Sequence, residues 1–191
     1  MTDPHLSIDV IHERLSGQAA TCAQCGLAES RTQVVWAAGK PSARIMLVGE
    51  APGRNEDEGG EPFIGAAGKV LDGVLAEVSL ARDDLYITNV VKCRPPQNRT
   101  PNATEIQACS PWLKAQIELI KPRVIGALGL VATRSFNPAV RSMGAVQGVP
   151  FAIEGYTVVP MYHPAAIIYD RQKYDALLQS ARILKSISVD A

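Results

Sequence analysis

The chain has 191 residues, of which 47% are hydrophobic and 20% are charged, as in an ordinary globular protein. Nineteen basic and nineteen acidic residues give a formal net charge of zero, so any contact with nucleic acid must be local. No apolar run approaches the roughly 20 residues of a membrane span, and the N-terminus lacks the features of a signal peptide. We therefore expect one cytoplasmic, monomeric domain over residues 1–191, without a membrane contact.

The first part of the chain carries a helix and a cysteine pair. Apolar residues at helical spacing predict an amphipathic helix within residues 1–20. Cys22 and Cys25 follow, with two residues between them. Two thiolates at this spacing can bind one metal centre, but they can equally form a redox pair. This pair alone is a weak indication of either.

A long loop follows the first buried strand. The apolar run 45–48 predicts that strand, and apolar residues at helical spacing after residue 68 predict a helix. The loop between them contains six glycines, two prolines and five acidic residues around a single phenylalanine, Phe63. A surface connector has little use for such a residue, which favours a binding loop. The alternative is a solvated acidic loop whose Phe63 packs into the core.

The next strand ends in a polar residue and a basic loop. The run 85–91 is rich in β-branched residues and is typical of a buried strand. Asn89 stands where apolar residues belong, so its amide either joins a structural network or reads a ligand. The loop 92–101 then carries three cations and Cys93. This loop is either a DNA contact or a solvated turn.

A fourth cysteine lies in the following helix. Asn102 and Glu105 form the pattern of a capping box, and the helix that they begin contains Cys109. All four cysteines of the chain thus form the pattern C-x2-C-x67-C-x15-C. Four sulfur ligands in two pairs suit a tetrahedral zinc ion or a cubane iron–sulfur cluster, and the spacing does not choose between them.

The last third of the chain adds two strands and a closing helix. The runs 124–128 and 156–161 are typical of buried strands, and residues 174–187 keep a helical period. Residues 134–148 show no clear pattern. The alternation of strands and helices predicts a three-layer α/β/α fold with a mainly parallel central sheet.

Three candidate site residues follow strands of this sheet. Glu50, Asn89 and His163 stand at or just beyond the C-terminal ends of predicted strands, where open α/β sheets bind ligands. Shortly after His163, the adjacent Ile167 and Ile168 would be unusually apolar for a surface segment. The sequence therefore predicts a binding site at this edge of the sheet.

Four motifs occur together in the chain: GEAPG..ED..G.PF.G.AG from residue 49, YITNVVKCRPPQNRTP from residue 86, the cysteine pattern, and HPAA from residue 163. Together they resemble the family 4 uracil-DNA glycosylases, the iron–sulfur branch of that superfamily, over nearly the whole chain. The resemblance implies a repair enzyme that acts on single- and double-stranded DNA, hydrolyses the N-glycosidic bond of uracil and leaves an abasic site. It also implies a 4Fe–4S cluster on Cys22, Cys25, Cys93 and Cys109.

The resemblance assigns roles in recognising uracil. Phe63 would stack on a uracil flipped out of the DNA. Asn89 would donate to uracil O4 and accept from N3–H, a pattern that cytosine cannot match. Glu56 would crowd the C5 edge and exclude thymine. The backbone of Gly49, Glu50 and Ala51 resembles the family's uracil-binding turn.

The resemblance also assigns roles in catalysis and in DNA binding. His163 would donate to the oxyanion that develops on uracil O2, and the Glu50 carboxylate would orient the attacking water. Either Ile167 or Ile168 would be an apolar wedge that enters the base stack. Three cations are candidate contacts to DNA phosphates: Arg94, Arg99 and Arg171.

Two related branches and two other functions are less consistent with the sequence. No histidine lies between His12 and His163, so the covalent DNA capture of one branch is not expected, and Glu50 argues against a branch that lacks this acid. One alternative function is a non-catalytic nucleic-acid-binding protein with a structural cluster. The other is a nucleotide-binding protein, but the loop after residue 48 lacks a known phosphate motif. The sequence gives no sign of a sliding-clamp partner.

Overall fold

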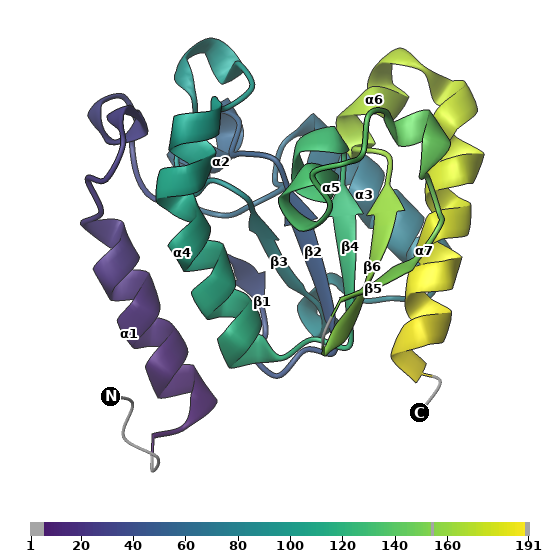
Figure 1. Ribbon diagram of the computed structural model, residues 1–191, viewed down its shortest axis with the longest axis horizontal. Helices are drawn as coiled ribbons and strands as arrows, with labels where there is room; N and C mark the ends of the chain where they lie inside the picture. Colours follow the sequence, from purple (N-terminus) through teal and green to yellow (C-terminus); the bar gives the residue numbers. More distant parts are fainter. Residues whose placement is uncertain (1–5, 154, 190–191) are drawn as a thin grey trace.

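The computed structural model describes residues 6–153 and 155–189 (Figure 1). Its centre is a six-stranded sheet with the order β1-β3-β2-β4-β6-β5. The four inner strands are parallel, and each edge strand runs antiparallel to its neighbour. The predicted, mainly parallel sheet is therefore confirmed. The strands are β1 (Ala38–Gly39), β2 (Ile45–Gly49), β3 (Tyr86–Asn89), β4 (Val124–Leu128), β5 (Phe151–Ile153) and β6 (Tyr156–Met161).

The inner strands are apolar because both faces of the sheet are covered. In β2, Ile45 and Leu47 pack into one hydrophobic cluster, whereas Met46 and Val48 pack into the other. Successive side chains of a strand point to opposite faces, so a strand buried on both faces reads as a continuous apolar run. All residues of β2, β3 and β4 are buried accordingly.

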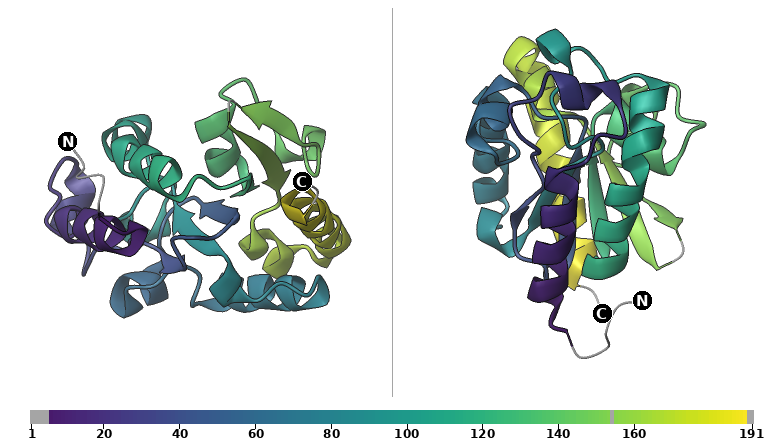
Figure 2. Two further views of the ribbon diagram at one scale, coloured as in Figure 1. Left: turned by 90° about the horizontal axis from the view of Figure 1, so that it is seen from below. Right: turned by 90° about the vertical axis from the view of Figure 1, so that its left-hand side faces the viewer.

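Helices form the two outer layers, as Figure 2 shows from below the sheet. Core residues of α3, α6 and α7 pack on one face of the sheet, and those of α4 and α5 pack on the other, where α1 lies against α4. The three-layer prediction is confirmed. The helices are α1 (Ile8–Ala20), α2 (Arg54–Gly59), α3 (Ala66–Glu77), α4 (Ala103–Ile120), α5 (Leu130–Phe136), α6 (Pro164–Tyr169) and α7 (Tyr174–Val189).

Several short elements were not predicted from the sequence pattern, among them those in two loop regions. The loop after β2 contains the short helix α2, and the region 134–148 contains the end of α5 and a 3-10 turn at Met143–Ala145, shortly before the edge strand β5. These elements are too short to show a hydrophobic period. No helix among the described residues is both long enough and apolar enough to cross a bilayer.

Candidate active site

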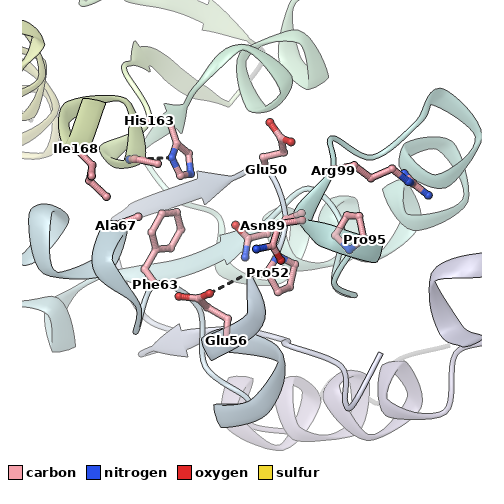
Figure 3. A pocket seen from close by; sticks show the side chains of 14 residues that line it. Glu50, Pro52, Glu56, Phe63, Ala67, Asn89, Pro95, Arg99, His163 and Ile168 are labelled. Atoms are coloured by element: carbon pink, nitrogen blue, oxygen red, sulfur yellow. Dashed lines mark hydrogen bonds between the residues drawn. The ribbon is translucent and has the colours of Figure 1, made fainter. Parts of the chain in front are cut away.

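A cavity of about 420 Å³ opens beyond the C-terminal ends of the inner strands (Figure 3). Its walls come from the loop after β2, the end of β3, the loop before α4 and the start of α6. This size suits a small organic ligand. Of the predicted site residues, those that line the cavity are Glu50, Ala51, Glu56, Phe63, Asn89, Arg99, His163 and Ile168.

The Phe63 ring forms one wall and is held in a strained backbone conformation. Phe63 has a backbone φ of 58°, which is unusual for a bulky residue. Its side chain is only 5% exposed. Its ring centroid lies 5.6 Å from that of His163, with a tilt of 32° between the planes. A Cβ atom on Gly68 would come within 1.7 Å of the Phe63 carbonyl oxygen, so a glycine is required there. The surroundings therefore fix Phe63 as a flat apolar wall.

Asn89 ends β3 beside Gly49 of β2, and its side chain faces the cavity (Figure 3). Asn89 is 2% exposed, and its Oδ1 atom is buried without a hydrogen-bond partner among the described residues. Such an orphaned acceptor costs free energy unless a ligand N–H satisfies it. Gly49 does not line the cavity itself, but a Cβ there would lie 2.3 Å from Asn89 Oδ1 and 2.5 Å from Phe63 Cζ.

His163 caps the N-terminus of α6. Its Nδ1 atom accepts a hydrogen bond from the backbone N–H of Ala165 at 3.1 Å, which leaves the ring hydrogen on Nε2. Burial lowers the pKa of His163 from 6.5 to about 4. At neutral pH the ring is therefore uncharged and can act as a hydrogen-bond donor through Nε2.

Glu50 follows β2 and is half-buried on the cavity wall. Burial raises the pKa of its carboxyl group, and a hydrogen bond from the Thr100 side chain partly opposes this shift because it stabilises the charged form. Thr100 belongs to the loop that precedes α4. The charge of Glu50 therefore depends in part on this loop, which no sequence pattern indicates.

Glu56 faces the cavity but is anchored by three backbone N–H groups. Its Oε2 accepts from Gly53 at 3.0 Å, and its Oε1 accepts from Ile64 at 3.0 Å and from Gly65 at 2.8 Å. These bonds satisfy donors at the starts of α2 and α3. The Glu56 carboxylate therefore links the two ends of the loop segment 53–65. Its contact with the C5 edge of a base stays a prediction.

The four cysteines line a second cavity, between α1, the loop after β3 and α4. None forms a disulfide. Three of the sulfurs accept hydrogen bonds, from Arg31 Nη1 to Cys93 at 3.2 Å, from Lys92 N to Cys109 at 3.3 Å and from Trp112 Nε1 to Cys22 at 3.4 Å. Among the described residues, no group of three or more His, Cys, Asp or Glu side chains is placed to hold a single metal ion.

Comparison with known proteins decides the family. Residues 36–185 match the family model described as the uracil DNA glycosylase superfamily. The chain belongs to this superfamily.

The curated relatives are consistent with the type-4 branch of the superfamily. The type-4 uracil-DNA glycosylase of Archaeoglobus fulgidus is 41% identical over 179 residues, which cover 88% of this chain and 87% of the relative. That of Thermotoga maritima is 44% identical over 161 residues, covering 83% and 84%. A type-5 enzyme of Pyrobaculum aerophilum is 34% identical over 146 residues, covering 68% and 64%. The family resemblance expected from the motifs is thus confirmed.

The two isoleucines beyond the HPAA motif of the glycosylase lie in different environments. Ile168 is 49% exposed and lines the cavity, whereas Ile167 is 6% exposed and packs in the hydrophobic core. The prediction left open which of the two is the wedge, and Ile167 is the less suitable one because the short helix α6 turns it toward the core. Ile168 remains the candidate wedge.

The three candidate phosphate contacts also differ. Arg171 is exposed in a 3-10 turn after α6, and Arg94 is half-buried, with its Nε donating to Asn98 Oδ1 at 2.7 Å. Arg99 instead forms a bidentate ion pair with Glu105, at 2.6 and 2.8 Å. This pair ties the loop to the start of α4, and the phosphate contact of Arg99 stays a prediction.

Proposed function

We propose that the chain hydrolyses the N-glycosidic bond of uracil in DNA, releasing free uracil and leaving an abasic site. One observation carries this proposal. A single cavity presents an orphaned amide acceptor on Asn89 and a neutral N–H donor on His163 beside the ring of Phe63. A flipped uracil offers an N3–H donor, carbonyl acceptors and a flat ring in return.

Recognition of the base would rest on Phe63 and Asn89. Flipping a nucleotide out of a duplex costs a few kcal/mol, which stacking on Phe63 offsets in part. Asn89 Oδ1 accepts from uracil N3–H while its amide N–H donates to O4. Cytosine presents an acceptor at position 3 and a donor at position 4, so it would leave the buried Asn89 amide unpaired, at a cost of about 1–3 kcal/mol.

Bond cleavage would rest on His163 and Glu50. As the bond between C1′ and N1 breaks, its electron pair moves onto the uracil, and negative charge grows on O2. His163 Nε2–H donates to that oxygen, as a preorganised donor that needs no proton transfer. Glu50 orients a water toward C1′, accepts its proton as the C–O bond forms, and offsets the positive charge on the sugar.

We also propose that Cys22, Cys25, Cys93 and Cys109 hold a 4Fe–4S cluster. The donor set fits, because four thiols line one cavity and three of their sulfurs already receive N–H donors, as cluster thiolates do. When bound, the cluster would supply a structural link between α1, the loop after β3 and α4. About four iron and four sulfide ions per chain would support this group, whereas zinc alone would contradict it.

The substrate class is tested by supplying different bases. Purified protein is incubated with oligonucleotides of one sequence that carry uracil, thymine or cytosine at a single position, and free base is measured by chromatography. The proposal predicts release of uracil and no detectable release of the other two bases. Equal release of all three, or binding without release of uracil, would contradict it.

A further inference from the structure

Lys92 is a fully buried lysine that the proposed chemistry does not use. Its exposed fraction is 1%, and it lies three residues after Asn89 and directly before Cys93. It lines the cavity of the four cysteines, on the far side of the strand end from the uracil cavity. Burial of a lysine is expensive unless its nitrogen is fully hydrogen-bonded, so this position calls for a physical reason.

The Lys92 ammonium group has three acceptors for its three N–H bonds. Nζ lies 2.6 Å from the Asn89 carbonyl oxygen, 2.7 Å from Thr88 Oγ1 and 2.6 Å from Gln116 Oε1. The ring of Trp36 lies beneath it, with 5.7 Å between Nζ and the ring centroid. A neutral amide or hydroxyl side chain has too few donors to replace this arrangement.

The acceptors are themselves held in place. The Thr88 hydroxyl donates to the Trp36 carbonyl at 2.8 Å, which turns its lone pairs toward Lys92. The Gln116 amide donates through Nε2 to the Trp36 carbonyl at 3.2 Å and to the Tyr86 hydroxyl at 3.0 Å, which leaves Oε1 for Lys92. The network is therefore built around the ammonium group.

The backbone of Lys92 is fixed as well. Its N–H donates to Cys109 Sγ at 3.3 Å, and its carbonyl accepts from Val35 N at 2.8 Å. One residue thus contacts a cysteine of the second cavity through its main chain and the carbonyl of Asn89 through its side chain. Strand β1 pairs with β3 only as far as Ile87. The Asn89 carbonyl therefore lies beyond the residues of β3 that pair with β1.

We propose that Lys92 is a positioning residue for uracil recognition, because its ammonium group holds the carbonyl of Asn89 and so fixes the amide that reads the base. The inference rests on the proposed function and deepens it. Discrimination by hydrogen bonds requires the reading group to be held within about 0.5 Å of its productive position. Lys92 provides this support through its contact with the Asn89 carbonyl at the end of β3, and it also lines the cysteine cavity.

The decisive variant is Lys92→Met, which keeps most of the side-chain length and removes all three donors. We expect the affinity for free uracil, measured as product inhibition, to weaken by about 10-fold or more. The reason is that the buried carbonyl of Asn89 loses its hydrogen-bond donor, so the Asn89 amide is no longer held in position. The preference for uracil over cytosine should fall as well. Iron content and secondary structure should stay at the level of the unmodified protein.

Gln116→Met provides a milder second variant, because it removes one acceptor of Lys92 and touches neither Asn89 nor a cysteine. It should weaken uracil affinity in the same direction by a smaller factor. Leu184→Ala serves as the stability control, since Leu184 is a fully buried residue of α7, which packs on the other face of the sheet. It should lower the melting temperature without changing uracil affinity.

The outcomes separate this proposal from the proposed function. Wild-type affinity and base preference in folded Lys92→Met and Gln116→Met would overturn the role of Lys92 while leaving the glycosylase intact. Weakened affinity found only in preparations that have lost their iron would also overturn it, because the effect would then pass through the cluster. Failure of the unmodified protein to release uracil would instead refute the proposed function.

Discussion

The Nδ1 atom of His163 accepts a hydrogen bond from the backbone N–H of Ala165, at 3.1 Å. The start of α6 therefore sets the tautomer of the ring that faces the cavity. Burial lowers the pKa of His163 to about 4, so the ring is uncharged at neutral pH and donates through Nε2. His163 of the HPAA motif thus combines a helix cap with an uncharged N–H donor at the cavity.

Replacing His163 by alanine should slow bond cleavage much more than binding. Loss of one preorganised oxyanion donor typically lowers kcat by about 100- to 1000-fold. Because the contact strengthens only as charge develops, kcat and kcat/KM should fall together while KM changes little. Single-turnover and steady-state rates of uracil release measure both quantities. A large rise in KM with unchanged kcat would show that His163 acts in ground-state binding instead.

The acid limb of the pH–rate profile should report Glu50. Burial raises the pKa of this carboxyl above its ordinary value of 4.5, and the active form is the carboxylate, so kcat/KM should fall as the pH drops through that raised pKa. His163, with a pKa of about 4, stays neutral over most of this range. Thr100→Val should move the limb to higher pH, because it removes a hydrogen bond that favours the charged form.

Thr100→Ser is the matched control for this shift, since it keeps the hydroxyl group and should leave the limb where it is. An acid limb that is identical in wild type and in Thr100→Val would show that another group controls it.

The two neighbouring isoleucines should respond differently to truncation. Ile168→Ala removes the exposed candidate wedge and should slow excision from duplex DNA more than from single strands, because only the duplex must be opened. Ile167→Ala creates a cavity in the core and should lower the free energy of unfolding by about 2–5 kcal/mol. Excision rates on both substrates and chemical denaturation measure these effects. Equal slowing on both substrates by Ile168→Ala would refute the wedge.

Salt dependence should distinguish Arg94 and Arg171, which form no ion pair with Glu105, from Arg99, which does. Each phosphate contact contributes about 0.9 to the slope of log affinity against log salt on duplex DNA. Arg171→Ala and Arg94→Ala should each reduce the magnitude of that slope by about 0.9, the contribution of one phosphate contact. Arg99→Ala should leave the slope unchanged and lower stability, because Arg99 is committed to Glu105. A reduced slope in Arg99→Ala would show that its ion pair opens on DNA.

The inner sheet was predictable because its strands are buried on both faces. The continuous apolar runs of β2 and β4 follow from that burial, and the edge strands β1 and β5, with two and three residues, leave no such signal. Glu50, Asn89 and His163 could be placed together because parallel strands bring their C-terminal ends to one edge.

Other features of the site depend on tertiary contacts that no sequence pattern encodes. Ile167 and Ile168 are identical residues, and only the orientation of α6 separates a core side chain from an exposed one. The pairing of Arg99 with Glu105 likewise depends on how the loop folds back onto α4. The sequence places Lys92 among the cations of a basic loop, yet its side chain is buried and its Nζ contacts the Asn89 carbonyl.

The most direct test is to measure free uracil released from uracil-containing oligonucleotides, single- and double-stranded, by the wild type and by Asn89→Ala and His163→Ala. We expect release by the wild type and a reduction of at least about 100-fold in His163→Ala. Asn89→Ala should also release much less and lose its preference for uracil. No release by folded, iron-containing wild-type protein, or unchanged release by both variants, would contradict the account.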